Sequence, residues 1–116
     1  MNFKSQLLDF SGYEMTDQSQ ESLYNYFVYG LEPGGFMTAV LSNDLYGASA
    51  RADFVNTKLM AHYAQWLVNR APYGSYGSAE MVRGWLGQNE YFVRFQKDLV
   101  AERLRTPESA LNDPLF

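Results

Sequence analysis

The sequence predicts an all-α protein, a compact bundle of four or five short helices with no significant β-sheet. Apolar residues recur three and four positions apart in several separate segments, which is the spacing of one face of a helix. No segment alternates apolar and polar residues between turn signals over the length of a strand. The 116 residues, 47% hydrophobic and 16% aromatic, suffice for one core without disulfides or metals.

Residues 1–17 are expected to form a partly ordered N-terminal arm, because their apolar residues follow no sustained period and Gly12 interrupts them. A helix is predicted from about residue 18 to Gly30, since glycine commonly ends a helix. Three residues are candidates to cap the start of this helix with a side-chain oxygen: Thr16, Asp17 and Ser19.

The clearest punctuation in the chain is the run from Gly30 to Gly35, in which Pro33 suits the first turn of a new helix. Gly34 and the glycine after it permit a positive φ and a close approach of the backbone. Glu32 would repel a phosphate, and no lysine follows the two glycines. We therefore expect this helix start to pack closely against another helix rather than to bind phosphate.

Four further helices are predicted between Phe36 and the C-terminus. The first should end or kink around Asn43, because Asn, Asp and Gly are weak residues in a helix interior. Ser78 is the predicted N-cap of the third, and the residues before it have the composition of a turn. The expected bounds of the four helices are about 36–43, 51–69, 79–86 and 89–104. The helical domain would then span residues 18–105, with a tail over residues 106–116.

The apolar stripes of these helices predict a core rich in aromatic residues. One face of each helix should be largely buried. The residues expected on these faces are Leu23, Phe27, Phe36, Val40, Leu59, Tyr63, Trp66, Leu67, Val82, Trp85, Leu86, Phe92, Phe95 and Leu99.

Candidate catalytic and metal-binding groups are few. The chain has no cysteine, which excludes disulfides, thiol catalysis and cysteine-based metal sites. Its one histidine, His62, lacks a second ligand one helical turn away, so we expect it to pack or to form a hydrogen bond. No serine lies in the glycine context of a nucleophile elbow. We therefore expect no enzyme activity, no catalytic residue, no metal and no cofactor, with a small hydrolase as the alternative left open.

A polar cluster is expected where the two central predicted helices meet. Asn43 and Asp44 can satisfy backbone groups near a helix end, Arg51 can reach Asp44, and Asp53 suits a helix start. Asn56 follows one turn later and can bridge helices. We expect a polar network joining the two helices, with a binding site for a partner's backbone or a small ligand as the alternative.

The charge balance bears on the kind of partner. The net charge is −4 and the pI is near 4.8, which disfavours direct binding to nucleic acid or to anionic membranes. The chain shows no apolar run of the length that a signal peptide or a membrane span needs. We therefore expect a cytoplasmic protein that acts without a membrane.

Five short motifs follow one another over residues 30–86. They are a Pro-Gly-Gly-Phe start at 33–36, an Ala-Val-Leu-x-Asn-Asp-Leu helix at 39–45, an Ala-Asp-x-x-Asn helix at 52–56, an Ala-Pro turn at 71–72 and an aromatic-Gly-Ser cap at 76–78. In this order they resemble a group of small uncharacterised proteins from bacteriophage and mobile-element genomes. The resemblance implies a phage origin and a host-cell cytoplasm as the location. The group has no established activity, so it assigns no functional residue.

These observations favour a small acidic phage-type protein that binds a host or defence-system protein and inhibits or modulates it by surface occlusion, as an anti-CRISPR protein would. The acidic N-terminal half suits a partner with a basic nucleic-acid-binding surface, and tyrosines are common in interface hot spots. The expected partner-binding residues, with at least partly exposed tyrosine rings, are Glu21, Tyr24, Tyr29, Glu32, Asp44, Tyr46, Tyr73 and Tyr76.

The alternative is an accessory phage protein associated with nucleic acid. Basic residues in the last third of the chain, together with aromatic residues near them, would contact phosphates and stack on bases. The residues of this alternative are Arg83, Arg94, Lys97, Arg103, Arg105, Tyr73, Tyr76 and Trp85. Acidic residues alternate with the basic ones in the same segment, which favours a solvated, salt-bridged helix face instead.

Overall fold

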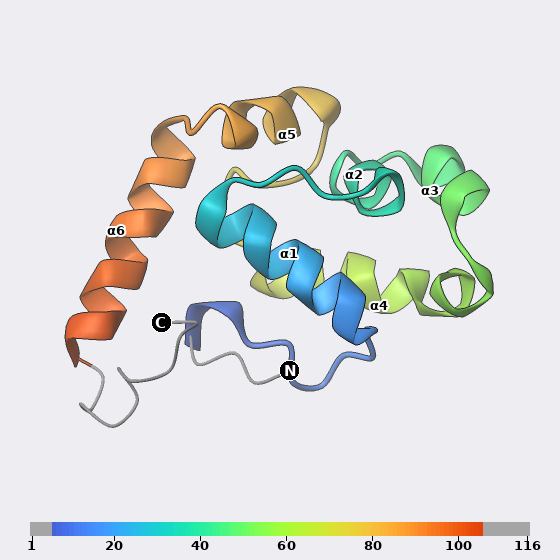
Figure 1. The fold of residues 1–116 in the computed structure, drawn as a ribbon, viewed down its shortest axis with the longest axis horizontal. Helices are drawn as coiled ribbons and strands as arrows, with labels where there is room; N and C mark the ends of the chain where they lie inside the picture. The colour runs from blue at the N-terminus through green and yellow to red at the C-terminus, as the bar shows by residue number, and fades with distance from the viewer. Residues whose placement is uncertain (1–5, 106–116) are drawn as a thin grey trace.

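The computed structural model describes residues 6–105, which form six α-helices and one short 3-10 helix (Figure 1). No strand occurs among these residues, so the all-α prediction is confirmed. The elements are η1 (Gln6–Leu8), α1 (Asp17–Tyr29), α2 (Gly35–Leu41), α3 (Leu45–Arg51), α4 (Phe54–Arg70), α5 (Ala79–Leu86) and α6 (Glu90–Arg105).

The helices pack around α1 and α4, with α3 at one end of the molecule and α6 at the other (Figure 1). The short helix α2 contacts α1, α3, α4 and α5, so it connects the α3 end to the rest of the bundle. α5 leads directly into α6. This arrangement leaves one side of α1 beside the segment that enters α2, and that side carries the groove described below.

Three helix ends follow the predicted capping residues. The side chain of Thr16 accepts a hydrogen bond from the Ser19 backbone N–H and caps α1. Gly30 ends α1 in the left-handed conformation with φ 67°. Ser78 Oγ accepts from the Met81 backbone N–H at 3.1 Å and starts α5. Local side-chain chemistry therefore fixes these boundaries.

The predicted start of the longest helix is wrong. The expected helix over residues 51–69 begins only at Phe54, and Arg51 belongs to the separate helix α3. Asp53 causes the break, because its Oδ1 accepts from the Asn56 backbone N–H at 2.7 Å and makes a new helix start. Asp44 caps α3 in the same way, through the Gly47 backbone N–H at 2.9 Å. The Asp44 cap outweighs the weak helix propensity of the residues that follow it. Helix α3 is therefore present in addition to the predicted helices.

The core consists mainly of aromatic rings in contact. Phe27 lies between the two tryptophans, with its ring centroid 5.6 Å from that of Trp66 and 6.2 Å from that of Trp85. The Trp85 ring also packs against Phe92 and Phe95 of α6. Nine of the fourteen predicted core residues are buried: Leu23, Phe27, Tyr63, Trp66, Leu67, Val82, Trp85, Phe92 and Phe95. Five are half-buried and pack against that core: Phe36, Val40, Leu59, Leu86 and Leu99.

The described part of the N-terminal arm contributes to this core. Leu8 and Phe10 are buried, and the Phe10 ring lies 4.7 Å from that of Trp66. The backbone N–H of Glu14 donates to His62 Nδ1 at 3.0 Å, so His62 holds the arm against α4. The hydrogen-bonding role predicted for His62 is confirmed.

Candidate functional site

Two adjoining hollows lie between α1 and the segment that enters α2, and we call them together the α1–α2 groove. They measure about 280 Å³ and about 260 Å³, and both are lined by Gln18, Ser22 and Gly34. The first is also lined by Glu21, Asn25, Leu31, Glu32 and Pro33. The second is also lined by Ser19, Gly35, Phe36, Met37, Arg51, Asp53 and Asn56.

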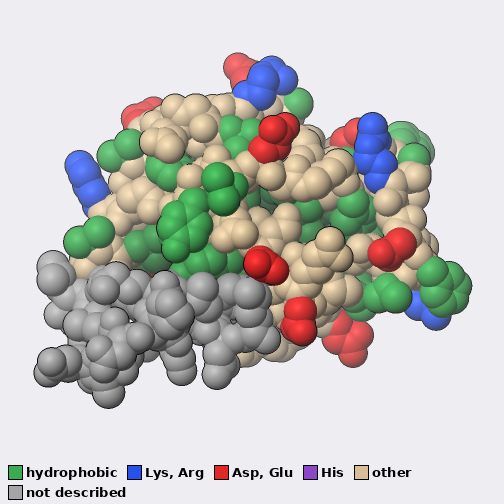
Figure 2. Space-filling view, viewed as in Figure 1, with side chains coloured by type: hydrophobic (Ala, Val, Ile, Leu, Met, Phe, Trp, Pro, Cys, Tyr) green, Lys and Arg blue, Asp and Glu red, His purple; other side chains and the backbone are tan. Residues whose placement is uncertain are grey.

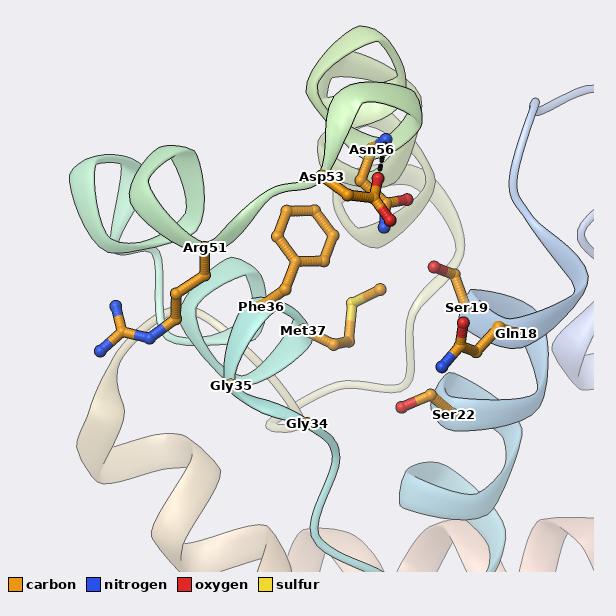
Figure 3. Close-up of a pocket in the computed structure, with 10 residues that line it drawn as sticks. All are labelled: Gln18, Ser19, Ser22, Gly34, Gly35, Phe36, Met37, Arg51, Asp53 and Asn56. Atoms are coloured by element: carbon orange, nitrogen blue, oxygen red, sulfur yellow. Dashed lines mark hydrogen bonds between the residues drawn. The ribbon is translucent and has the colours of Figure 1, made fainter.

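The groove carries more negative than positive charge. Glu21 of α1 and Glu32 of the connecting segment line the same hollow, and Asp53 lines the other. Arg51 is the one basic residue among the described side chains that line the groove, and it points away from α1 (Figure 3). Figure 2 shows Asp and Glu side chains spread over this face of the molecule, with Lys and Arg side chains toward its edges.

Two hydrogen bonds to backbone carbonyls hold the wall of the groove in place. The N–H of Leu31 donates to the carbonyl of Asn25 at 3.2 Å, which fixes the connecting segment to the end of α1. Thr38 Oγ1 donates to the carbonyl of Pro33 at 3.2 Å, which fixes the same segment to α2. Because both ends are anchored, the segment that carries Glu32 is positioned beside α1 without a ligand.

The two glycines at the start of α2 differ from each other: the expected close packing against another helix holds at Gly35 and not at Gly34. Neither has a positive φ, and a Cβ atom on Gly34 would meet nothing within 4 Å. The predicted close packing against another helix is therefore wrong at this position. A Cβ on Gly35 would lie 3.2 Å from Cδ of Arg51, so a side chain of α3 covers this glycine.

A polar network closes the α4 end of the groove. The Tyr63 hydroxyl contacts Asn56 Oδ1 at 2.6 Å and Ser19 Oγ at 3.0 Å. Since Asn56 Oδ1 only accepts, the single proton of Tyr63 is donated to it, and Ser19 donates to Tyr63. Tyr63 is fully buried, Ser19 is buried and Asn56 is half-buried, so this network links α1 and α4 through two buried hydroxyls.

This network differs from the one expected at the central helices. Asn56 bonds to Tyr63 of its own helix, and the link to another helix reaches α1 through Ser19. Asp44 caps α3, and Arg51 Nη1 donates to the carbonyl of Gly47 at 3.2 Å. The side chains of Asp44 and Arg51 therefore form hydrogen bonds within α3 and do not join it to another helix.

The predicted partner-binding residues do not gather on one surface. Glu21 and Glu32 meet in the α1–α2 groove. Asp44 and Tyr46 lie at the start of α3, where Tyr46 is 87% exposed. Of the other predicted tyrosines, Tyr29 is exposed at the end of α1, and in the loop before α5 Tyr73 is exposed and Tyr76 is half-buried.

The expected exposure of Tyr24 is wrong. Its side chain is only 3% exposed, and its ring packs edge-on against Tyr29 at 6.3 Å between centroids. α1 is covered over a wider arc than one apolar stripe, so a residue that flanks Leu23 and Phe27 is buried with them. Tyr24 therefore supports the fold and offers no ring to a partner.

Exposed apolar side chains lie at the first turns of two helices, where the sequence predicted only Tyr46 to be exposed. Leu45, Phe54 and Val55 are also exposed, at the first turns of α3 and α4. Figure 2 shows hydrophobic side chains on the surface at this end of the molecule. The signal was an apolar pair directly after each capping aspartate, since residues in a first helical turn often face solvent when the helix packs through later turns.

The basic and aromatic residues of the nucleic-acid alternative do not form one surface. Trp85 is fully buried and its Nε1 donates to the Tyr26 carbonyl at 2.9 Å, so it cannot stack on a base. The side chains of Arg103 and Arg105 lie outside the described residues. Tyr73 and Arg94 do come together, around a separate hollow beside α6.

Among the described residues, no three His, Cys, Asp or Glu side chains gather where they could hold a metal ion. None of the helices in that part of the chain combines the length and apolar character needed to cross a bilayer. Comparison with protein-family models, with curated proteins and with solved structures finds no match to this chain.

Proposed function

We propose that this chain is a binding protein that docks on a basic surface of a partner protein through the α1–α2 groove. The partner is a host or defence-system protein whose nucleic-acid-binding surface is covered, in the manner of an anti-CRISPR protein made by a phage or mobile element. The observation that carries this proposal is that Glu21 and Glu32 line the same hollow, whose wall is held in place by hydrogen bonds.

Electrostatics favour a basic occupant of this groove. Three carboxylates line it against one guanidinium, Arg51, that points away from α1. An acidic surface accelerates the encounter with a basic partner and disfavours acidic ones. A partner arginine fits best, because its planar guanidinium donates to two carboxylate oxygens at once.

Apolar side chains beside the acidic residues provide apolar surface that a partner can bury. Leu31 lines the groove and is 54% exposed, and Tyr29 precedes it at the end of α1. Aromatic and apolar anchors at the centre of an interface carry most of its binding energy, whereas exposed charges mainly set rate and specificity. We therefore expect Leu31 and Tyr29 to lie under the partner, with the two glutamates against its basic residues.

The experiment that tests the proposal is capture of partners from a bacterial lysate with the tagged chain, with and without nuclease treatment. The proposal expects a protein that stays bound after nuclease and is lost with the Glu21→Lys/Glu32→Lys variant. A matched control, Glu80→Lys/Glu90→Lys, makes the same change of charge at two exposed positions outside the groove and should retain the partner.

Two outcomes would contradict the proposal. Loss of the captured protein on nuclease treatment would show that nucleic acid mediates the contact. Equal capture by the groove variant and by the control would show that the acidic groove is not the docking surface. Circular dichroism of each variant confirms that its helices are intact before the comparison is made.

A further inference from the structure

A separate hollow, of about 220 Å³, lies between the C-terminal end of α4, the loop before α5 and α6. Two arginines and two tyrosines line it: Arg70, Arg94, Tyr73 and Tyr91. It shares no lining residue with the α1–α2 groove, so its role is independent of the docking proposed above. We call it the α6 hollow.

Hydrogen bonds within the loop that carries Tyr73, and from this loop to α1 and α2, hold it in place. Ser75 is fully buried, and its Oγ donates to the Pro72 carbonyl at 2.6 Å. The Tyr26 hydroxyl donates to the Ser75 carbonyl at 2.7 Å, and the Gly77 N–H donates to the Leu41 carbonyl at 2.8 Å. These bonds hold the loop in one conformation.

The ring of Tyr73 is nevertheless 78% exposed at the edge of the hollow. It stands edge-to-face with Tyr91, with ring centroids 5.3 Å apart. Gly74, with φ +84°, allows this arrangement, because a Cβ atom there would lie 2.6 Å from Cδ2 of Tyr91. The Tyr73 ring is therefore held in one orientation although most of its surface faces solvent. A tyrosine that only stabilised the fold would bury its ring.

The charged groups of the α6 hollow favour an anion. Neither Arg70 nor Arg94 forms an ion pair with a carboxylate of the described residues, so their N–H donors remain available. Asp98 also lines the hollow, and Asp9 is close enough to Arg70 to interact with its charge. Two guanidiniums beside one hollow match the oxygens of a phosphate, which accepts several charge-assisted hydrogen bonds.

We propose that the α6 hollow binds a nucleoside phosphate, with the phosphate at Arg70 and Arg94 and the base stacked on Tyr73. The hollow is smaller than the roughly 300–1,000 Å³ of most small-molecule sites, so it holds the phosphate while the base lies outside on the tyrosine ring. Stacking on an exposed tyrosine is tolerant of base identity. The ligand is a free nucleotide or the phosphorylated end of a single strand, because both carry this chemistry.

The test is a titration of the full chain, followed by NMR or intrinsic fluorescence, with AMP, adenosine, inorganic phosphate and a 5′-phosphorylated tetranucleotide. AMP should bind about tenfold more tightly than adenosine or inorganic phosphate, because only AMP uses both the arginines and the ring. Its affinity should fall with rising salt. A tetranucleotide that binds more tightly than AMP identifies a strand end, and equal affinity identifies a free nucleotide.

Variants assign the binding to the named residues. Arg70→Gln/Arg94→Gln should weaken AMP binding about tenfold or more, and Tyr73→Ala should weaken it about tenfold. Arg83→Gln and Tyr46→Ala remove an exposed arginine and an exposed tyrosine away from the hollow and should leave the affinity unchanged. The proposal is overturned if AMP does not bind saturably, if adenosine or phosphate binds as tightly, or if the double arginine variant retains the wild-type affinity.

Discussion

The indole nitrogen of Trp85 donates a 2.9 Å hydrogen bond to the backbone carbonyl of Tyr26, 59 residues earlier in the chain. Trp66 does the same to the carbonyl of Asp9, at 2.9 Å and across 57 residues. Both indoles are fully buried, so each ring adds a directional bond to the apolar area that it removes from water. The two tryptophans thereby fix α5 on α1 and the arm on α4.

Trp66→Ala should lower the free energy of unfolding by about 3–5 kcal/mol, because it removes a fully buried ring and leaves a cavity. That is a large part of the roughly 5–15 kcal/mol by which such domains are stable. Urea denaturation followed by circular dichroism measures the loss. Val68→Ala, on the exposed side of the same helix, should change stability by less than about 0.5 kcal/mol. A Trp66→Ala protein with the wild-type midpoint would refute the described core.

Tyr63→Phe tests the buried network that closes the groove. The change keeps the ring but leaves Ser19 and Asn56 without their shared hydroxyl, so we expect a loss of about 1–3 kcal/mol. Thermal melts of this variant and of Tyr46→Phe measure the effect. Tyr46 is almost fully exposed, and its loss of a hydroxyl should leave the melting temperature unchanged. Equal melting temperatures for both variants would show that the network adds no stability.

Gly30→Ala and Gly34→Ala should behave differently, although both change a glycine near the groove. Gly30 has φ 67°, and a Cβ there would lie 3.3 Å from Cε2 of Phe92, so alanine should cost about 1–2 kcal/mol. Gly34 has φ −65° and open space around its Cα, so alanine should change stability by less than about 0.5 kcal/mol. Urea denaturation midpoints of the two variants measure the difference. A larger loss of stability for Gly34→Ala than for Gly30→Ala would contradict the structure.

Alkaline pH should destabilise the fold through Tyr26. Burial raises the pKa of this phenol above its ordinary value of about 10. Between that value and the higher pKa in the folded state, only the unfolded chain releases the proton. The contribution of Tyr26 to the free energy of unfolding is therefore fully present below about pH 10 and is lost as the pH rises above that value. Melting temperatures at a series of pH values above 8 should show a smaller alkaline decline for Tyr26→Phe than for the wild type, and an equal decline would contradict this linkage.

The sequence predicts much of this fold because its strongest signals are local. Thr16, Gly30 and Ser78 cap helices by contacts within a few residues, and those boundaries were predictable. The separate helix before Asp53 was not predicted, because a capping aspartate inside a helical pattern competes with the helix propensity of its neighbours, and here the cap prevails. Tyr24 is buried for a tertiary reason, the wide cover over α1, which its spacing does not reveal.

The candidate surfaces were predictable only in part. Glu21 and Glu32 stood out by charge, but their meeting along one hollow depends on the path of the chain between Gly30 and α2. Arg94 and Tyr73 were both noted in the sequence, whereas Arg70 and Tyr91 join them only because α6 packs beside the end of α4. Contacts between distant segments therefore define both surfaces.

Docking through the α1–α2 groove is best tested by the dissociation constant of the purified captured protein for the wild-type chain and its variants, at low and high salt. Glu21→Lys/Glu32→Lys should weaken binding about tenfold or more and remove most of its salt dependence, because it replaces two attractive charges by two repulsive ones. Glu80→Lys/Glu90→Lys should weaken binding much less, although it changes the net charge equally. A groove variant that binds like the wild type at both salt concentrations, with its helices intact, would show that the α1–α2 groove is not the docking surface.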